Sequence, residues 1–574
     1  MTGVMRTLRV ALAVPMVLAA GACGDGAPVP AASRPAPATV SVSPASVPAP
    51  AGDPAARAAA AVAAMSDADL AGQVLMPYAY GSSATSVDEA SAAGNRGLAG
   101  VDTPAEMVAE YRLGGLILVG FSPKDPTGAT NPTTNVENPA QVRALTAGLQ
   151  AAARQLPGGA PLMIGTDQEY GVVTRVTDGV TMLPSAMGAG AAGKPQLTEA
   201  AWHAAGEELA AMGITVDFAP VADTLGPGGN AVIGSRSFGA DPAANAAQVA
   251  AAVRGLQSAG VSAALKHFPG HGHTTGDSHE GLPVVGRSEA AWRSQDLPPF
   301  RAGVRAEAGV VMSGHLDVRA LDRGVPATFS RKIMTEVLRG QLGFTGVAIT
   351  DAMNMPPAMT WPPGEAAVRA LNAGNDMLLM PPDIGAARDG ILGALASGGL
   401  PRERLVEAVT RILTLKFRTA GHTQPDLATV ASPAHRRAVA ALDAASITVL
   451  RGRCAGPLVS GPVTVTAAPV REKARVTLVK ALQAAGIPVR AAGGTVVHLV
   501  GYGDKTADLD PTAAVTVLMD TPYLLAASRS PTLIATYSSS GLSLTALAAV
   551  LAGKAKAPGR SPVAVAGLPR SACA

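Results

Sequence analysis

Eight short apolar runs, separated by longer alanine-rich segments with helical periodicity, constrain the fold of this chain more than any other feature. The runs are GQVLMPYAY (72–80), GGLILVG (114–120), APLMIGTDQE (160–169), ITVDFAPVAD (214–223), VSAALKHFPG (261–270), GVVMSGHLD (309–317), FTGVAITDAM (344–353) and NDMLLMPPD (375–383). Continuous apolar runs between helical segments suit parallel strands that are buried on both faces. Eight such strand–helix units predict an α/β fold with a (β/α)₈ TIM barrel over residues 57–425.

Polar residues follow several of these runs at the point where each predicted strand ends. They are Asp167, Asp223, Lys266, His267, His315, Asp317 and Asp351. The carboxyl ends of barrel strands open on one shared face, where the chemistry of such barrels lies. We therefore expect these side chains to meet in one site.

A smaller α/β domain is expected over residues 432–574. Strands are predicted from the runs SITVL, PVTVTAA, TVVHLVGYG, AAVTVLMD, TLIATYSS and SPVAVAG, the last at 561–567, and helices from EKARVTLVKALQAAG and LSLTALAAVLAGK. Such an alternation suits a layered sheet with helices packed on it. None of its motifs is as specific as those of the barrel, so we expect it to support the barrel without taking part in catalysis.

The first 23 residues have the pattern of an export signal. Arg6 and Arg9 precede an apolar run that ends at Cys23 and is too short to span a bilayer comfortably. The small residues before Cys23 favour a lipobox, in which that cysteine carries the lipid; ordinary signal-peptide cleavage is the alternative. Residues 24–56, rich in Pro, Ala and Ser, are expected to be a disordered tether. The chain is thus expected outside the cytoplasmic membrane, anchored or secreted.

Two further cysteines, Cys454 and Cys573, remain after Cys23. An exported chain meets an oxidising compartment, so the pair predicts one disulfide, with two free thiols as the alternative. Charged residues make up 15% of the chain, the net charge is +3 and aromatic residues make up 3%. This balance argues against a nucleic-acid partner.

Four of the nine histidines fall within KHFPGHGHTTGDSH, residues 266–279, here called the histidine loop. A metal site is disfavoured because the histidines lie in a Gly/Pro-rich loop with no cysteine near. A purely structural loop is a second alternative. Proton transfer is favoured, because Asp277 stands two residues before His279 and a carboxylate beside an imidazole fixes its tautomer.

Asp351 ends a wholly apolar run and is the natural nucleophile, although a helix N-cap is the simpler explanation for an isolated Asp. Asp167, Arg175 and Arg236 are expected either to bind ligand hydroxyls or to form structural ion pairs.

These motifs together resemble glycoside hydrolase family 3, and within it the bacterial β-N-acetylglucosaminidases. The likeness covers roughly residues 60–420 and rests on KHFPGHG followed by DSH, TDQE, DFAPVAD, IGSRSFG and ITDAMNM, in matching order. The chain departs from the family's DQEGGRV, because Tyr170 and Val172 replace a Gly and an Arg.

The resemblance implies a role for each matching position. Asp351 matches the nucleophile, His279 the general acid/base and Asp277 its orienting carboxylate, while the sugar-binding positions are matched by Asp167, Arg175, Arg236, Lys266 and His267. It implies no cofactor and no metal. The function expected is a retaining exo-β-N-acetylglucosaminidase acting on cell-wall fragments. A phosphorylase, another β-glycosidase such as a glucosidase or xylosidase, and a noncatalytic sugar-binding lipoprotein remain as alternatives.

Overall fold

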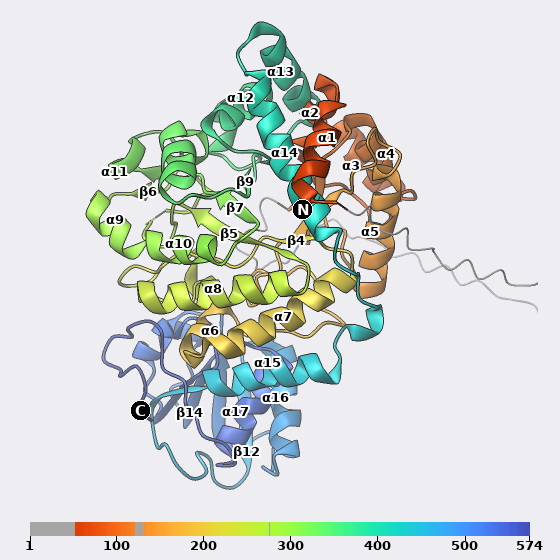
Figure 1. Cartoon of the computed structure of the whole chain (residues 1–574). Coiled ribbons are helices and arrows are strands. Elements are labelled where there is room, and N and C mark those ends of the chain that lie inside the picture. Colours follow the sequence, from red (N-terminus) through yellow and green to blue (C-terminus); the bar gives the residue numbers. More distant parts are fainter. Residues whose placement is uncertain (1–51, 121–126, 128–130, 275, 574) are drawn as a thin grey trace, which may run out of the picture. The chain divides into compact units, whose positions relative to one another are not determined.

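The computed structural model describes residues 52–120, 127, 131–274 and 276–573 (Figure 1). The predicted signal segment, Cys23 and most of the predicted tether lie outside these residues. Within the described part of the chain, no helix is both long enough and apolar enough to cross a membrane.

The first helix, α1 (Pro54–Ala63), begins inside the segment that was expected to be tether. The Asp53 side chain accepts a hydrogen bond from the Ala56 N–H, and Pro54 fits the first helical position, where no N–H is needed. Ala58 and Val62 are buried, and the Arg57 guanidinium lies 4.1 Å from the centre of the Phe417 ring. Packing against the barrel therefore begins three residues before the expected boundary at residue 57, because a capped alanine-rich helix lies here.

The eight apolar runs form eight parallel strands. They are β1 (Leu75–Met76), β2 (Gly115–Leu118), β3 (Met163–Thr166), β4 (Val216–Asp217), β5 (Ser262–Phe268), β7 (Val310–Ser313), β9 (Val347–Thr350) and β10 (Leu378–Leu379). Six of them form one sheet in the order β2-β3-β4-β5-β7-β9, and β1 pairs with β10. A parallel bridge between Ile349 and Met377 and a 3.0 Å hydrogen bond from Ile117 N to Pro77 O join the two sheets. The prediction of a (β/α)₈ barrel is confirmed.

Helices surround these strands (Figure 1). They are α2 (Asp67–Gln73), α3 (Glu89–Ala99), α4 (Pro104–Tyr111), α5 (Pro139–Ala153), α6 (Ala186–Ala192), α7 (Pro195–Ala211), α8 (Pro242–Ser258), α9 (Glu289–Gln295), α10 (Leu297–Arg305), the π-helical segment Lys332–Gln341, α12 (Pro363–Ala373), α13 (Ile384–Ser397) and α14 (Arg402–Thr419). Two of the alanine-rich segments between the apolar runs form α5 and α8. Helix α5 begins at Pro139 after the N-cap residue Asn138, and α8 begins at Pro242 after the N-cap residue Asp241. Each N-cap side chain accepts backbone N–H groups of its helix. Two short additions, β6 (Val284–Val285) and β8 (Asp317–Val318), pair with each other beside the barrel.

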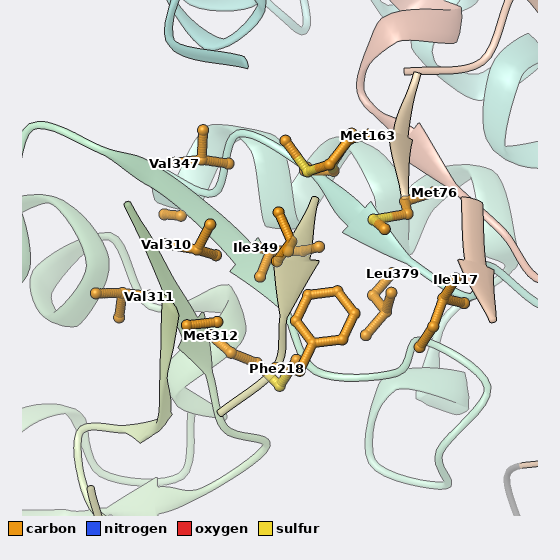
Figure 2. Close-up of a cluster of buried hydrophobic side chains, with 14 of the residues drawn as sticks. Met76, Ile117, Met163, Phe218, Val310, Val311, Met312, Val347, Ile349 and Leu379 are labelled. Carbon is orange, nitrogen blue, oxygen red and sulfur yellow. The ribbon is translucent and has the colours of Figure 1, made fainter. Parts of the chain in front are cut away.

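Large side chains from different strands fill the barrel interior, as Figure 2 shows for Met76, Phe218, Ile349 and Leu379. Gly165 on β3 makes room for the Phe218 ring. A Cβ at residue 165 would lie only 2.8 Å from that ring and 2.7 Å from the Met76 methyl group. The interior is therefore a packed core rather than a channel, and ligands are left with the open end of the barrel.

The C-terminal region forms a five-stranded sheet in the order β11-β15-β14-β13-β12. Its strands are β11 (Thr448–Arg451), β12 (Val463–Ala467), β13 (Thr495–Val500), β14 (Val515–Leu518) and β15 (Thr532–Ala535), and its helices are α15 (Pro433–Ser446), α16 (Glu472–Ala484) and α17 (Gly541–Leu551). All neighbours are parallel except β11, which runs antiparallel to β15 at the edge. The predicted smaller α/β domain is confirmed.

The strand predicted at 561–567 was wrong. This segment makes only an isolated bridge between Val565 and Leu568. Its alternating pattern has a different cause: Val563 and Val565 are buried in an apolar cluster, while the Pro562 carbonyl accepts a hydrogen bond from Ala240 N of the barrel. Burial of alternate residues against another surface thus imitated the pattern of a strand.

The barrel and the C-terminal domain share an apolar interface. Helix α15 packs against α6 and α7 of the barrel and against α17 of its own domain. The apolar cluster at this interface joins the barrel residues Met187, Ala191, Val221, Leu225 and Ile233 to Leu450, Val500, Leu518, Leu533 and Tyr537. A disulfide between Cys454 and Cys573, with a Cα–Cα distance of 5.1 Å, joins the chain end to the segment after β11.

Candidate active site

One cavity opens at the carboxyl ends of the barrel strands. It is lined by Ile117, Thr127, Asn131, Asp167, Arg175, Val232, Arg236, Lys266, His267, His271, Ser278, His279, Met312, Asp351, Ala352, Met355, Leu379 and Met380. Seven of the eight residues to which the family resemblance assigns a catalytic or sugar-binding role are in this lining, whereas the strand-end residues Asp223, His315 and Asp317 are not. The eighth, Asp277, lies directly behind His279.

Asp351 follows β9, and its backbone is held by a 2.9 Å hydrogen bond from its N–H to Ser313 O. No helix begins at this residue, so the N-cap explanation does not apply; the carboxylate accepts the neighbouring Ala352 N–H at 2.8 Å instead. Burial raises the pKa of Asp351, but the His267 and His315 rings, the Ala352 N–H and His279 outweigh it and hold the pKa below its ordinary value. An ionised carboxylate therefore faces the cavity.

His279 and Asp277 form a hydrogen-bonded pair. His279 Nδ1 lies 2.7 Å from Asp277 Oδ1, and that same oxygen accepts the His279 backbone N–H at 2.9 Å. Burial raises the pKa of Asp277. Its hydrogen bonds with His279 lower that pKa by more, so the pKa lies below its ordinary value and the carboxylate stays ionised. Because Asp277 engages Nδ1, the Nε2 atom of His279 is the ring nitrogen that remains for a ligand.

A buried group of alternating charges forms one wall of the cavity. Lys266 Nζ lies 2.6 Å from Asp167 Oδ1 and 2.7 Å from Glu169 Oε1. Arg236 binds the Glu169 carboxylate through two nitrogens, Nε at 2.7 Å and Nη2 at 2.9 Å. Burial raises the pKa of Glu169, but Arg236 and Lys266 hold it far below the usual range. The charges are thus fixed in place before any ligand arrives.

Arg175 completes this wall. Its Nη2 atom lies 3.6 Å from Asp167 Oδ2 and donates to Thr127 Oγ1 at 2.8 Å. The Gln168 side-chain oxygen accepts the backbone N–H groups of Arg175 and Val176, both at 3.0 Å. The turn between Asp167 and Arg175 is therefore closed by Gln168, which the sequence did not single out.

Tyr170, where the family commonly has glycine, lies in this turn with φ of +64°. Its side chain is 2% exposed and packs edge-on against Trp202, with ring centres 5.7 Å apart. The tyrosine thus points into the core between β3 and α7 and is not part of the cavity lining. Its replacement of glycine changes packing behind the site rather than the ligand surface.

His267 is the residue before the end of β5, and both of its ring nitrogens have a partner. Nδ1 lies 2.8 Å from Asp223 Oδ2, and Nε2 lies 3.3 Å from Arg236 Nη2. Asp223 also accepts the His271 backbone N–H at 2.7 Å, so one buried carboxylate organises the start of the histidine loop. Asp223 does not itself line the cavity.

The other histidines of the loop each have a different partner. His271 contacts Thr274 Oγ1 through Nδ1 and Ser278 Oγ through Nε2, at 2.7 and 3.2 Å, and its burial lowers its pKa to about 4. His273 Nδ1 lies 2.5 Å from Asp296 Oδ1, which ties the loop to the start of α10. Among the described residues, no group of three or more His, Cys, Asp or Glu side chains has a metal-binding arrangement.

The sequence assigned no role to several residues in and around the site. His315 was noted at a strand end but assigned no role; its Nε2 contacts Ala352 O at 3.0 Å and so supports the turn after Asp351. Asp317, noted at the same strand end, lies away from the cavity and binds Arg319 and the Gly324 N–H. The apolar lining residues Met312, Met355 and Leu379 carry no sequence signal that separates them from core residues.

Comparison with known proteins agrees with this geometry. Residues 85–415 match the model of the "Glycosyl hydrolase family 3 N terminal domain". A solved structure, a glycoside hydrolase family 3 β-N-acetylglucosaminidase from Paenibacillus sp., aligns with a TM-score of 0.75 and 31% identity, covering 88% of this chain and 99% of that one.

Two curated bacterial relatives are also similar. β-Hexosaminidase A of Pseudoalteromonas piscicida is 36% identical over 385 residues, which is 62% of this chain and 62% of the relative. A β-hexosaminidase of Stenotrophomonas maltophilia is 40% identical over 248 residues, which is 42% of this chain and 71% of the relative. The family model covers more than half of the chain and includes every residue of the cavity wall. The chain therefore belongs to glycoside hydrolase family 3.

Proposed function

We propose that this protein is a retaining exo-β-N-acetylglucosaminidase. The observation that carries the proposal is that Asp351 and His279, the latter held by Asp277, line the same cavity. The names of the relatives, β-hexosaminidase and β-N-acetylglucosaminidase, support the choice of sugar.

The mechanism follows from the two groups. His279 Nε2 donates its proton to the glycosidic oxygen while an Asp351 oxygen attacks the anomeric carbon, so the bond to the leaving group breaks as a covalent glycosyl-enzyme forms. His279, now neutral, accepts a proton from water. The water oxygen then attacks the same carbon and releases Asp351, and two inversions give net retention.

The wall of alternating charges would hold the sugar during both steps. Lys266 and Arg175 offer donors to sugar hydroxyls, and Asp167 offers an acceptor, while their ion pairs hold them in place. Donors fixed in advance need little reorganisation at the moment of reaction, which is the main source of electrostatic stabilisation. No metal or cofactor takes part in the proposed reaction.

The location and substrate source belong to the same proposal. The Arg6/Arg9 segment ending at Cys23 supports export with a lipid anchor, and the Pro/Ala-rich tether supports a site held away from the membrane. Outside the membrane, cell-wall fragments with a terminal N-acetylglucosamine are the expected substrates.

The decisive experiment measures aryl release from aryl β-N-acetylglucosaminide, glucoside and xyloside, each with and without inorganic phosphate. We expect turnover on the N-acetyl substrate without phosphate, and a β-configured product by NMR at early times. Phosphate-dependent release of a sugar 1-phosphate would instead identify a phosphorylase. No turnover on any substrate would leave a sugar-binding protein.

Asp351→Ala tests the nucleophile in the same assay. We expect loss of turnover by at least 10⁴-fold, because the covalent step has no replacement. The thermal midpoint should stay near that of the wild type, since the carboxylate has little role in packing. Retained turnover in a correctly folded Asp351→Ala protein would contradict the proposed mechanism.

A further inference from the structure

The segment between β4 and α8 lies between the histidine loop and the C-terminal domain. We call residues 226–238 the arginine loop, because it carries Arg236 and Val232 into the cavity wall. On one side it contacts the histidine loop, where Gly226 N donates to Gly272 O at 3.2 Å. The other side faces the C-terminal domain.

Asn230 makes the main polar contact between the two loops. Its Nδ2 group lies within hydrogen-bond distance of His271 O at 3.2 Å, Thr274 O at 3.0 Å and Thr274 Oγ1 at 3.2 Å. Its Oδ1 atom accepts the N–H groups of Val232 and Ile233 at 2.9 and 3.0 Å within its own loop. One side chain therefore holds its own turn through oxygen and the neighbouring loop through nitrogen.

The contact continues to the acid/base residue through side chains. Thr274 Oγ1 contacts His271 Nδ1 at 2.7 Å, and His271 Nε2 contacts Ser278 Oγ at 3.2 Å. Ser278 stands between Asp277 and His279. A continuous hydrogen-bonded path thus runs from Asn230 to the residue next to the general acid.

The C-terminal domain supports the arginine loop from behind. The Ser235 hydroxyl is hydrogen-bonded to the Asp520 carboxylate, which follows β14, and both residues are buried. A Cβ at Gly229 would lie 2.6 Å from the Tyr523 ring, and one at Gly234 would lie 3.4 Å from the Thr521 methyl group. The turn from Asp520 to Tyr523 is therefore packed closely against the loop that carries Asn230 and Arg236.

We propose that Asn230 is a positioning residue for the general acid, and that the Asp520–Tyr523 turn of the C-terminal domain holds the arginine loop in the required place. The proposal rests on the function proposed above. It gives the C-terminal domain an effect on catalysis although none of the domain's described residues lines the cavity. The effect passes through Ser235 to Asn230 and from there to the histidine loop.

Asn230→Asp isolates the contact between the loops. The variant keeps the oxygen that accepts Val232 and Ile233 N–H but loses the donors to His271 and Thr274. Asn230→Ser, which adds no charge, is the second variant. The matched control is Asn95→Asp, since Asn95 likewise accepts Tyr80 N–H and donates to Tyr80 O and Asp102 O, away from the histidine loop.

The measurement compares kcat/KM on aryl N-acetylglucosaminides with good and poor leaving groups. A dinitrophenolate leaves without protonation, whereas a methoxyphenolate needs the acid. We expect both Asn230 variants to lose at least tenfold on the methoxyphenyl substrate and less than threefold on the dinitrophenyl substrate. Asn95→Asp should keep the wild-type ratio. An equal loss on both substrates, or none, would overturn the role of Asn230.

Asp520→Ala and Asp520→Asn test the support from the C-terminal domain. Alanine should shift the leaving-group ratio in the same direction by about three- to tenfold, and asparagine, which can still accept from Ser235, should restore most of it. An unchanged ratio in Asp520→Ala would overturn this part. A wild-type protein inactive on every aryl substrate would instead refute the proposed function, so the two failures are distinguishable.

Discussion

Glu169 binds both Lys266 and Arg236 in the charged wall of the cavity, although Glu169 itself does not line the cavity. Its side chain is only 2% exposed. The two cations would repel each other without this carboxylate, and both would be buried with reduced charge compensation. Its role is thus to fix the residues that meet the ligand.

Glu169→Gln tests this role at constant shape. We expect the free energy of unfolding to fall by about 3–5 kcal/mol, because removing one partner of a buried charge pair leaves the others uncompensated. KM for an aryl N-acetylglucosaminide should rise at least tenfold. Urea denaturation and steady-state kinetics measure the two effects, and a variant with wild-type stability and KM would contradict the assigned role.

At the scale of elements, helix α15 joins barrel and C-terminal domain, and it carries a buried carboxyl group. Asp443 accepts a hydrogen bond from the Ser543 hydroxyl of α17. Burial raises the pKa of Asp443 to about 7. Because its ordinary value is 3.8, the folded state binds this proton more tightly than the unfolded state. The resulting stabilisation is complete below about pH 4 and is lost as the pH rises to about 7.

Asp443→Asn should remove this dependence, since the amide stays neutral. We expect the variant to be more stable than the wild type at pH 8 by about 1–3 kcal/mol, and to match it near pH 4. Urea denaturation at pH 4.5, 6 and 8 tests this. A wild type that instead gains stability relative to Asp443→Asn between pH 4.5 and 8 would show that the folded protein does not raise the pKa of Asp443.

The same scale shows how far the sequence carries prediction. All eight barrel strands and the polar strand ends were predictable, because buried parallel strands leave an unbroken apolar signal and their ends share one face. The pairing of Ser235 with Asp520 was not, since the two are 285 residues apart and each is an ordinary polar residue locally. The false strand at 561–567 has the same origin, because Val563 and Val565 are buried by a distant surface.

The residues of the active site also fall into those that a local motif predicts and those that depend on contacts with distant segments. The placement of Asp351, His279 and Asp277 at one cavity was predictable, because Asp351 ends an apolar run and Asp277 stands two residues before His279 in a short motif. Glu169, Gln168 and Asn230 act through contacts with other segments, which no local pattern records.

At the scale of the whole molecule, the barrel does not present a complete polar surface of its own. Met187, Ala191, Val221 and Ile233 are covered by the C-terminal domain in a shared apolar cluster. Separation of the domains would expose this cluster to water, which costs about 25 cal/mol for each Å² of apolar surface. We therefore expect the two domains to unfold together.

A chain ending at residue 431 tests this coupling against the 574-residue chain. We expect the short form to bind 1-anilinonaphthalene-8-sulfonate strongly, to aggregate at micromolar concentration and to lose most turnover. The longer form should show one cooperative thermal transition. A soluble, monomeric short form with full turnover would mean that the barrel is independent.

The closure of β1 onto β10 has a wider consequence for the cavity. The first residue that lines the cavity is Ile117 on β2, and the last is Met380, directly after β10. A nascent chain that stops before Met380 lacks one rim of the cavity. The cavity is therefore complete only once β10 has paired with β1.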